Sequence, residues 1–251
     1  MSGGPLVVTY PLTARSRAIV AEELGGAGEA IYLVDLPAEE RAAALSRAGA
    51  LLAHDTSKEL RPEEIPLIGN ARLLQFTAAG IDWVPTRGLP PELPVAANKG
   101  GGTEPMSEHI VALALGAAKR LFVEHDQLKC GEFNQGSANK MLRGGVCGIL
   151  GFGNVGVATA RLLRAFGMQI HAINRRGASE EPTDWIATPA RLDDMLRAAD
   201  LLVICAALTT ATEGLIGNRE LALMKDDAIL VNVARGEIGR ASCRERVSYH
   251  V

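Results

Sequence analysis

Three glycines with the spacing of a phosphate-binding turn stand in the second half of the chain. They belong to Gly151-Phe152-Gly153-Asn154-Val155-Gly156, which follows the apolar run 146–150 and precedes a helical pattern at 158–166. Between a strand and a helix, the first glycine permits a tight turn, the second lets the backbone approach a pyrophosphate, and the third allows close helix packing. The helix N-terminus adds unpaired N–H groups and a partial positive charge. We predict that Gly151, Gly153, Asn154, Val155 and Gly156 bind a dinucleotide cofactor, with S-adenosylmethionine as the alternative ligand of such a turn.

The residues that would contact the ribose follow the next strand. The pattern predicts that strand at 169–173, and it is followed by Asn174-Arg175-Arg176. An acidic residue at this position would hydrogen-bond the ribose hydroxyls of NAD, whereas a neutral Asn174 beside two guanidinium groups favours a 2′-phosphate. We predict NADP(H) as the preferred cofactor and NAD(H) as the alternative. The other interpretation of Arg175 and Arg176 is that they decorate a solvent-facing loop.

Two later strands place further residues beside this ligand. Apolar runs at 201–205 and 228–232 predict these strands in the same parallel sheet. Because ligands bind at the carboxyl ends of strands in such sheets, we expect the cofactor to lie beside Ala206, Val233, Ala234 and Arg235. Arg235 is the candidate for chemistry, since a guanidinium pairs bidentately with a carboxylate. A surface salt bridge is its alternative role.

Short apolar runs alternate with helix-length segments along most of the chain, as in βαβ units. Before the glycine turn, the predicted strands lie at 6–10, 31–34, 50–53 and 73–76, with helices at 15–24 and 41–47. A break rich in proline and glycine, from Pro85 to Gly102, interrupts the pattern, and we place a domain boundary there. The predicted fold class is α/β, with a doubly wound parallel sheet preceded by a smaller α/β domain.

A helix is expected directly after the break. Thr103 suits its N-cap and Pro105 its first turn. One face of this helix carries the apolar residues Met106, Ile110, Leu113, Ala117 and Leu121. The spacing predicts a core helix, and the polar, unpatterned segment 122–143 is expected to be an exposed excursion.

Composition and charge narrow the class of partner. The chain is 47% hydrophobic with 4% aromatic residues, which favours parallel sheets covered by helices. Its 26 basic and 29 acidic residues leave a net charge of −3, so no strong field favours nucleic acid or an anionic membrane. Four cysteines without a Cys-x-x-Cys pair indicate neither a disulfide framework nor a metal site. Because the chain shows neither a signal-peptide pattern nor a long apolar run, we expect a cytoplasmic protein. Its near-neutral charge favours a small molecule as the partner.

Several motifs in order resemble the D-2-hydroxyacid dehydrogenase family. They are the turn at 151–156, then Ala207-Leu208-Thr209-Thr210-Ala211-Thr212, then Val231-Asn232-Val233-Ala234-Arg235-Gly236. Upstream, Ala79-Gly80-Ile81-Asp82 resembles the substrate loop of this family, and 104–109 resembles the start of its interdomain helix. One departure is Ala207, where the family has proline. The resemblance implies a flavodoxin-like substrate domain at 1–98 and an NAD(P)-binding Rossmann domain at 99–237.

The resemblance also implies hydride transfer between NAD(P)H and a small 2-oxo acid or D-2-hydroxy acid. Arg235 would anchor the substrate carboxylate, and Ala79 and Gly80 would hold it through their backbone amides. The family further implies a homodimer. A cofactor-sensing binding protein, such as a corepressor of the same fold, is the alternative function.

The last residues depart from the family pattern. The family has a catalytic Glu and His further along, but this chain has only 16 residues after Arg235, and Glu245 and His250 there lack the expected spacing. The segment 238–251 resembles translated sequencing-adapter DNA joined to a gene fragment. We expect it to be non-native, with a genuine basic C-terminus as the alternative, and we expect the 251-residue chain to turn over poorly. Recovery of the same tail by resequencing the source locus would contradict this expectation.

Overall fold

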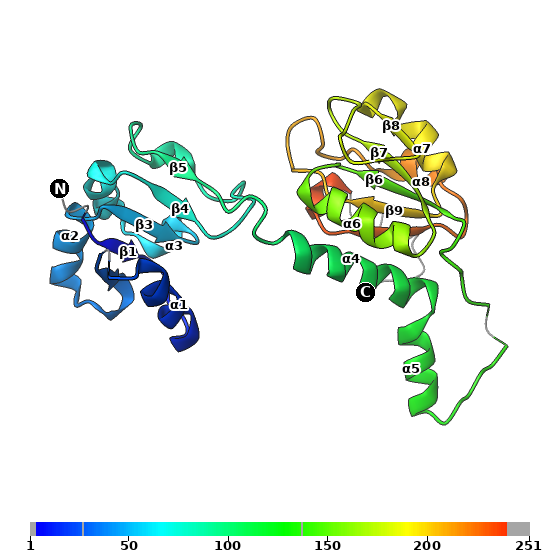
Figure 1. Cartoon of the computed structure of the whole chain (residues 1–251), viewed down its shortest axis with the longest axis horizontal. Helices are drawn as coiled ribbons and strands as arrows, with labels where there is room; N and C mark the ends of the chain where they lie inside the picture. The colour runs from blue at the N-terminus through cyan, green and yellow to red at the C-terminus, as the bar shows by residue number, and fades with distance from the viewer. Residues whose placement is uncertain (1–3, 27, 137, 240–251) are drawn as a thin grey trace. The chain divides into compact units, whose positions relative to one another are not determined.

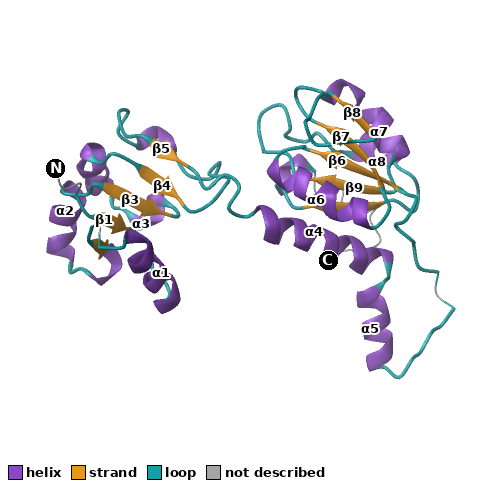
Figure 2. Cartoon of the chain, viewed as in Figure 1, coloured by secondary structure: helices purple, strands orange, loops and turns teal. Residues whose placement is uncertain are grey.

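The chain forms two compact units, Met1–Gly101 and Gly102–Val251. The structure, a computed structural model, describes residues 4–26, 28–136 and 138–239. Each unit is a parallel sheet with helices packed around it (Figure 1, Figure 2). The predicted α/β class is therefore confirmed. Among the described residues, no helix is long and apolar enough to cross a membrane.

The first unit has a five-stranded parallel sheet in the order β2-β1-β3-β4-β5. This order is flavodoxin-like, as predicted. Its strands are β1 (Leu6–Val8), β2 (Ala30–Tyr32), β3 (Ala50–Ala53), β4 (Leu74–Phe76) and β5 (Val95–Ala96). Its helices are α1 (Ala14–Leu24), α2 (Ala38–Ser46) and α3 (Thr56–Glu59), with 3-10 turns η1 (Leu33–Asp35), η2 (Pro62–Asn70) and η3 (Thr86–Gly88).

The second unit has a five-stranded parallel sheet in the order β10-β9-β6-β7-β8, the arrangement of a Rossmann domain. Its strands are β6 (Val146–Leu150), β7 (Gln169–Ile173), β8 (Trp185–Ala187), β9 (Leu201–Ile204) and β10 (Ile229–Asn232). Its helices are α4 (Thr103–Ala118), α5 (Leu121–Lys129), α6 (Asn154–Ala165), α7 (Leu192–Ala198) and α8 (Asn218–Leu223), with 3-10 turns η4 (Pro189–Arg191) and η5 (Gly236–Ile238).

Side chains from alternate positions of the second sheet build two separate cores. On one face, α4 and α6 pack together and cover residues such as Ile149 and Val203 (Figure 1). On the other face, α7 packs its Met195 against neighbours such as Leu150. These two covered faces explain why β6 and β9 are apolar along nearly their whole length.

The helix after the break differs from its prediction at both ends. Gly102, not Thr103, is at the N-cap of α4, and no side chain caps the helix. At the other end, Arg120 has a φ of 54°, in the left-handed region, which ends α4 and starts α5. Leu121, predicted on the core face, therefore opens α5 and is 54% exposed. Part of the predicted excursion at 122–143 is thus helical.

Only the start of the predicted tail lies within the described residues. Ile238 is fully buried, and its carbonyl accepts a hydrogen bond from Ile216 N at 3.0 Å. Residues 240–251, which carry most of the predicted tail, lie outside the described part of the chain.

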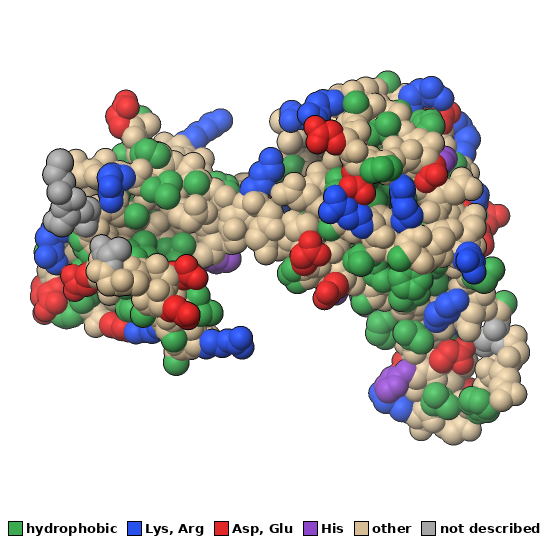
Figure 3. Space-filling view, in the orientation of Figure 1, with side chains coloured by type: hydrophobic (Ala, Val, Ile, Leu, Met, Phe, Trp, Pro, Cys, Tyr) green, Lys and Arg blue, Asp and Glu red, His purple; other side chains and the backbone are tan. Residues whose placement is uncertain are grey.

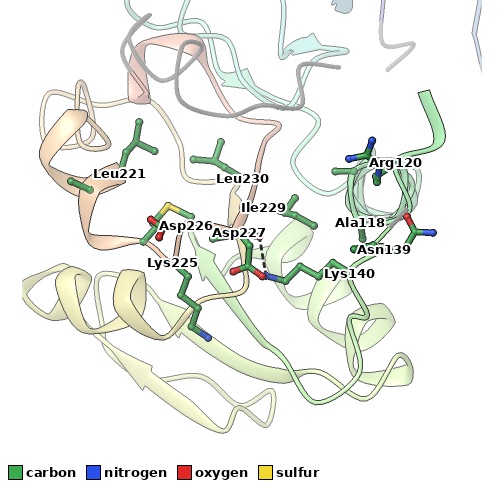
Figure 4. Close-up of a pocket in the computed structure, with 15 residues that line it drawn as sticks. Ala118, Arg120, Asn139, Lys140, Leu221, Lys225, Asp226, Asp227, Ile229 and Leu230 are labelled. Atoms are coloured by element: carbon green, nitrogen blue, oxygen red, sulfur yellow. Dashed lines mark hydrogen bonds and ion pairs between the residues drawn. The ribbon is translucent and has the colours of Figure 1, made fainter. Parts of the chain in front are cut away.

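An ionic network joins strand ends at the amino edge of the second sheet. Asp200 accepts a hydrogen bond from Val146 N at 2.9 Å and pairs with Lys225 Nζ at 2.9 Å. Lys140 Nζ lies 3.7 Å from Asp200 and 2.8 Å from Asp227 (Figure 4). Burial opposes ionisation of Asp200, but the Val146 N–H and the two ammonium groups outweigh it and lower the pKa of its carboxyl.

We expect Asp200→Asn to cost about 1–3 kcal/mol of unfolding free energy at neutral pH, because the substitution removes the charge that both lysines neutralise. The pKa of Asp200 is lower when folded, so its stabilisation is present above the unfolded pKa of about 3.9 and fades as the pH falls through the folded value. Urea unfolding of wild type and variant at neutral and acidic pH measures this difference. Asp226→Asn, at an exposed neighbour, is the control. Equal stabilities of wild type and Asp200→Asn at neutral pH would contradict the assignment.

Candidate functional site

The glycine turn passes directly over the backbone of the neighbouring strand end. A Cβ on Gly151 would lie 2.5 Å from Ala206 N and 2.6 Å from Ala206 Cα. Gly151 also has a φ of 99°, which side-chain-bearing residues rarely adopt. Only glycine meets both conditions, and the turn brings Gly151 and Ala206 together at the carboxyl edge of the sheet.

The other two glycines have opposite surroundings. A Cβ on Gly156 would lie 2.4 Å from Gly151 O, so α6 can pack this closely on the turn only with glycine there. A Cβ on Gly153 would meet no atom within 4 Å, and Gly153 and Asn154 are exposed. The turn is therefore closed on its protein side and open above Gly153.

The open side has the donors that a phosphate needs. Gly153 is the N-cap of the 12-residue helix α6, and no side chain caps this end. The first-turn N–H groups, which include those of Val155 and Gly156, have no carbonyl partner within their own helix. Free amides, the positive end of the helix dipole and open space above Gly153 all fit the pyrophosphate of a dinucleotide.

A buried thiol, which the sequence did not point to, supports this turn. Cys205 Sγ donates to Gly151 O at 2.9 Å. Burial raises the pKa of the Cys205 thiol to about 12, so it stays protonated and remains a donor at neutral pH. The spacing of the cysteines in the sequence carried no signal of this contact.

The Asn174 side chain organises the turn after β7. Its Oδ1 accepts from Arg176 N at 2.9 Å and from Gly177 N at 2.8 Å, and its Nδ2 donates to Ala178 O at 2.9 Å. Arg175 and Arg176 are exposed on this turn. Asn174 therefore acts first as a turn builder that presents two guanidinium side chains at the carboxyl edge.

The segment after β10 reaches the same edge. Asn232 holds it, because its Oδ1 accepts from Ala234 N at 3.0 Å and its Nδ2 donates to Arg235 O at 3.1 Å. Val233 N donates to Ile204 O at 3.1 Å, which ties the segment to the end of β9. Arg235 is partly buried, and its Nη1 donates to Ala234 O at 3.0 Å. The second unit thus collects the glycine turn, the arginine turn, Ala206 and Val233–Arg235 at one edge.

The predicted substrate loop belongs to the first unit. Ala79 and Gly80 follow β4 at the carboxyl edge of its sheet. Nearby, His54 Nδ1 lies 3.1 Å from Thr77 Oγ1, and the His54 ring lies 6.2 Å from that of Tyr10 and 6.3 Å from that of Trp83. Sequence reasoning missed these polar and aromatic residues, because their positions, from Tyr10 to Trp83, share no recognisable spacing.

A cavity of about 490 Å³ lies elsewhere in the second unit. It is lined by the end of α4, the start of β10 and the loop that carries Lys225 and Asp227 (Figure 4). This is the amino end of β10, opposite Arg235, and none of the predicted site residues lines the cavity. The candidate site is therefore the carboxyl edge, where the strand ends and the glycine turn meet.

Comparisons with known proteins agree with this geometry. Residues 111–241 match the model of the D-isomer specific 2-hydroxyacid dehydrogenase NAD binding domain. The chain is 40% identical over 145 residues to a glyoxylate reductase of Aeropyrum pernix, covering 54% of this chain and 43% of that protein. It is 35% identical over 141 residues to a glyoxylate/hydroxypyruvate reductase B of Pectobacterium carotovorum, covering 54% of this chain and 44% of that protein.

A solved structure extends the similarity to both units. A glycerate dehydrogenase related protein from Thermoplasma acidophilum superposes with a TM-score of 0.68 and 27% identity, covering 96% of this chain and 80% of that protein. The curated relatives above are matched over less than half of their length. Because the family model matches more than half of the chain, and in the domain that carries the glycine turn, the chain belongs to the D-isomer specific 2-hydroxyacid dehydrogenase family.

Proposed function

We propose that this protein is an oxidoreductase that transfers a hydride between NAD(P)H and a small 2-oxo acid or D-2-hydroxy acid. The observation that carries the proposal is that the second unit holds the glycine turn and Arg235 at one sheet edge. The bound nicotinamide supplies or accepts the hydride. The chain itself supplies the pyrophosphate cradle and a cation for the substrate.

Arg235 is the proposed carboxylate anchor. Asn232 fixes the backbone on which it stands, so the guanidinium is presented from a defined position. Its planar fork donates two parallel hydrogen bonds to a carboxylate and so fixes the orientation of the adjacent carbonyl carbon. The amides of Ala79 and Gly80 are the proposed further donors to the substrate carboxylate.

The preferred cofactor is proposed to be NADP(H). Asn174 is neutral, and the side chains of Arg175 and Arg176 are exposed to solvent on the turn that Asn174 holds. One guanidinium at about 5 Å from a phosphate charge contributes roughly 3 kcal/mol at an effective dielectric of 20, before screening and desolvation reduce it. This attraction favours NADPH over NADH.

We also propose that the protein forms a homodimer through α5 and the residues after it. The large apolar side chains exposed in this segment are Leu121, Phe122, Leu128 and Phe133. The space-filling view shows apolar side chains at the surface of this part of the second unit (Figure 3). Such a patch marks an interface in many soluble proteins. Sedimentation equilibrium of the 251-residue chain measures its oligomeric state. We expect a dimer, and a monomer would contradict this proposal.

The proposed compartment is the cytoplasm. The cysteines Cys130, Cys147 and Cys205 are free thiols in the described part of the chain. Free thiols fit a reducing compartment.

The function is tested by following NADPH oxidation with glyoxylate and hydroxypyruvate, using both the 251-residue chain and the product of the source gene. We expect Arg235→Ala to lower kcat/KM by on the order of 10²–10³-fold, because the substrate loses its bidentate partner. Arg235→Lys is the matched control, since it keeps the charge but loses the planar fork, and it should recover only part of the loss. If the source-gene product turns over no small 2-oxo acid yet binds nucleotide, the cofactor-sensing function replaces the reductase.

Cofactor choice is tested at the arginine turn. Asn174→Asp keeps an acceptor for Arg176 N and Gly177 N while adding a negative charge, so we expect KM to rise for NADPH and to fall for NADH. Replacing Arg175 and Arg176 together by alanine should raise KM for NADPH roughly tenfold or more and leave KM for NADH unchanged. A wild-type protein that uses both cofactors equally would remove the 2′-phosphate proposal.

A further inference from the structure

One residue after β5 holds two successive peptide groups of the substrate loop. Asn98 N donates to Ala78 O at 3.0 Å, and Asn98 Nδ2 donates to Thr77 O at 3.2 Å. The two carbonyls belong to adjacent peptides and are both turned toward Asn98. The backbone between β4 and Ala79 is therefore fixed from one side by a single asparagine.

This arrangement determines where the next amides point. A peptide group is planar and trans, so its N–H points away from its C=O. Because the carbonyls of Thr77 and Ala78 face Asn98, the N–H groups of Ala78 and Ala79 face the opposite side. Adjacent amides that point the same way form a concavity suited to an anion. Ala79 is exposed, and no hydrogen bond from its amide is present within the described part of the chain.

The position of the Asn98 side chain depends on a glycine three residues later. A Cβ on Gly101 would lie 2.4 Å from Asn98 Nδ2 and 2.5 Å from Asn98 Oδ1. Gly101 N also donates to Asn98 O at 3.2 Å, which closes the turn between them. A side chain at Gly101 must therefore displace the carboxamide, whereas a Cβ on Gly102 would meet nothing within 4 Å.

We propose that Asn98 is a positioning residue, which aims the Ala79 amide at the substrate carboxylate, and that Gly101 keeps the space that Asn98 needs. The inference rests on the proposed function, because it assigns a ligand to the Ala79 amide. Asn98 itself touches no reacting atom. Its role is to fix the direction of a donor before the substrate arrives, which reduces the ordering cost of binding.

The test compares Asn98→Leu, Gly101→Ala, their double variant and the control Gly102→Ala. Each is made both in the 251-residue chain and in the protein expressed from the gene recovered at the source locus. Leucine fills the asparagine's space but has no donor, so a space-filling role predicts little change. We expect Asn98→Leu and Gly101→Ala each to raise KM for the 2-oxo acid roughly fivefold to tenfold, with kcat changed less and the Kd for NADPH unchanged. The double variant should be no worse than either single one, since both remove the same contact. Gly102→Ala should match wild type.

An unchanged KM in either single variant overturns the inference, and so does a parallel loss of Tm and nucleotide affinity. Calorimetric titration of oxalate into the NADPH-saturated protein separates this failure from failure of the proposed function. If no 2-oxo acid is turned over, the proposed function fails. Weaker oxalate binding by Asn98→Leu than by wild type then still supports the proposal that Asn98 aims the Ala79 amide at a carboxylate. Equal oxalate affinity in the two proteins, or no oxalate binding by wild type, overturns the inference.

Discussion

The structure of the candidate site depends on the contact between the glycine turn and the end of β9. Gly151 lies where any side chain would collide with the backbone of Ala206, so the turn and the strand end are held as one surface. The Cys205 thiol reinforces this contact by donating to the Gly151 carbonyl. Close packing of Gly156 on the same carbonyl then sets where α6 begins. The free N–H groups that suit a pyrophosphate are a consequence of this packing.

The parallel arrangement of the strands brings the other candidate residues to the same edge of the sheet as the contact between Gly151 and Ala206. Because β6, β7, β9 and β10 all run in one direction, the residues that follow them gather at one edge of the sheet. Asparagine side chains then fix two of these connections, Asn174 the turn after β7 and Asn232 the segment after β10. The guanidinium groups proposed to bind ligand, on Arg175, Arg176 and Arg235, therefore stand on backbone that these two asparagines help to fix.

The sequence was sufficient for the fold class and for the residues at the strand ends, because hydrophobic runs and glycine spacing reflect local backbone requirements. It failed where contacts between residues far apart in the sequence, or a single backbone conformation, determine the structure. The end of α4 depends on the left-handed conformation of Arg120, which an otherwise continuous apolar pattern concealed. Asn98 and Cys205 make their key contacts with residues 20 or more positions away, at Thr77 and Gly151. No periodicity or motif spacing reports such contacts.

The proposed function requires that the open side of the glycine turn binds the pyrophosphate of a nicotinamide dinucleotide. Gly153 allows a direct measurement, since its φ of −101° suits any residue and a Cβ there meets nothing within 4 Å. Calorimetric titration of NADPH into wild type and Gly153→Val, with Tm recorded for both, tests it. We expect unchanged Tm and loss of NADPH binding in the variant, because the added side chain fills the phosphate position and nothing else. Equal NADPH affinity in the two proteins would show that the pyrophosphate does not bind at Gly153.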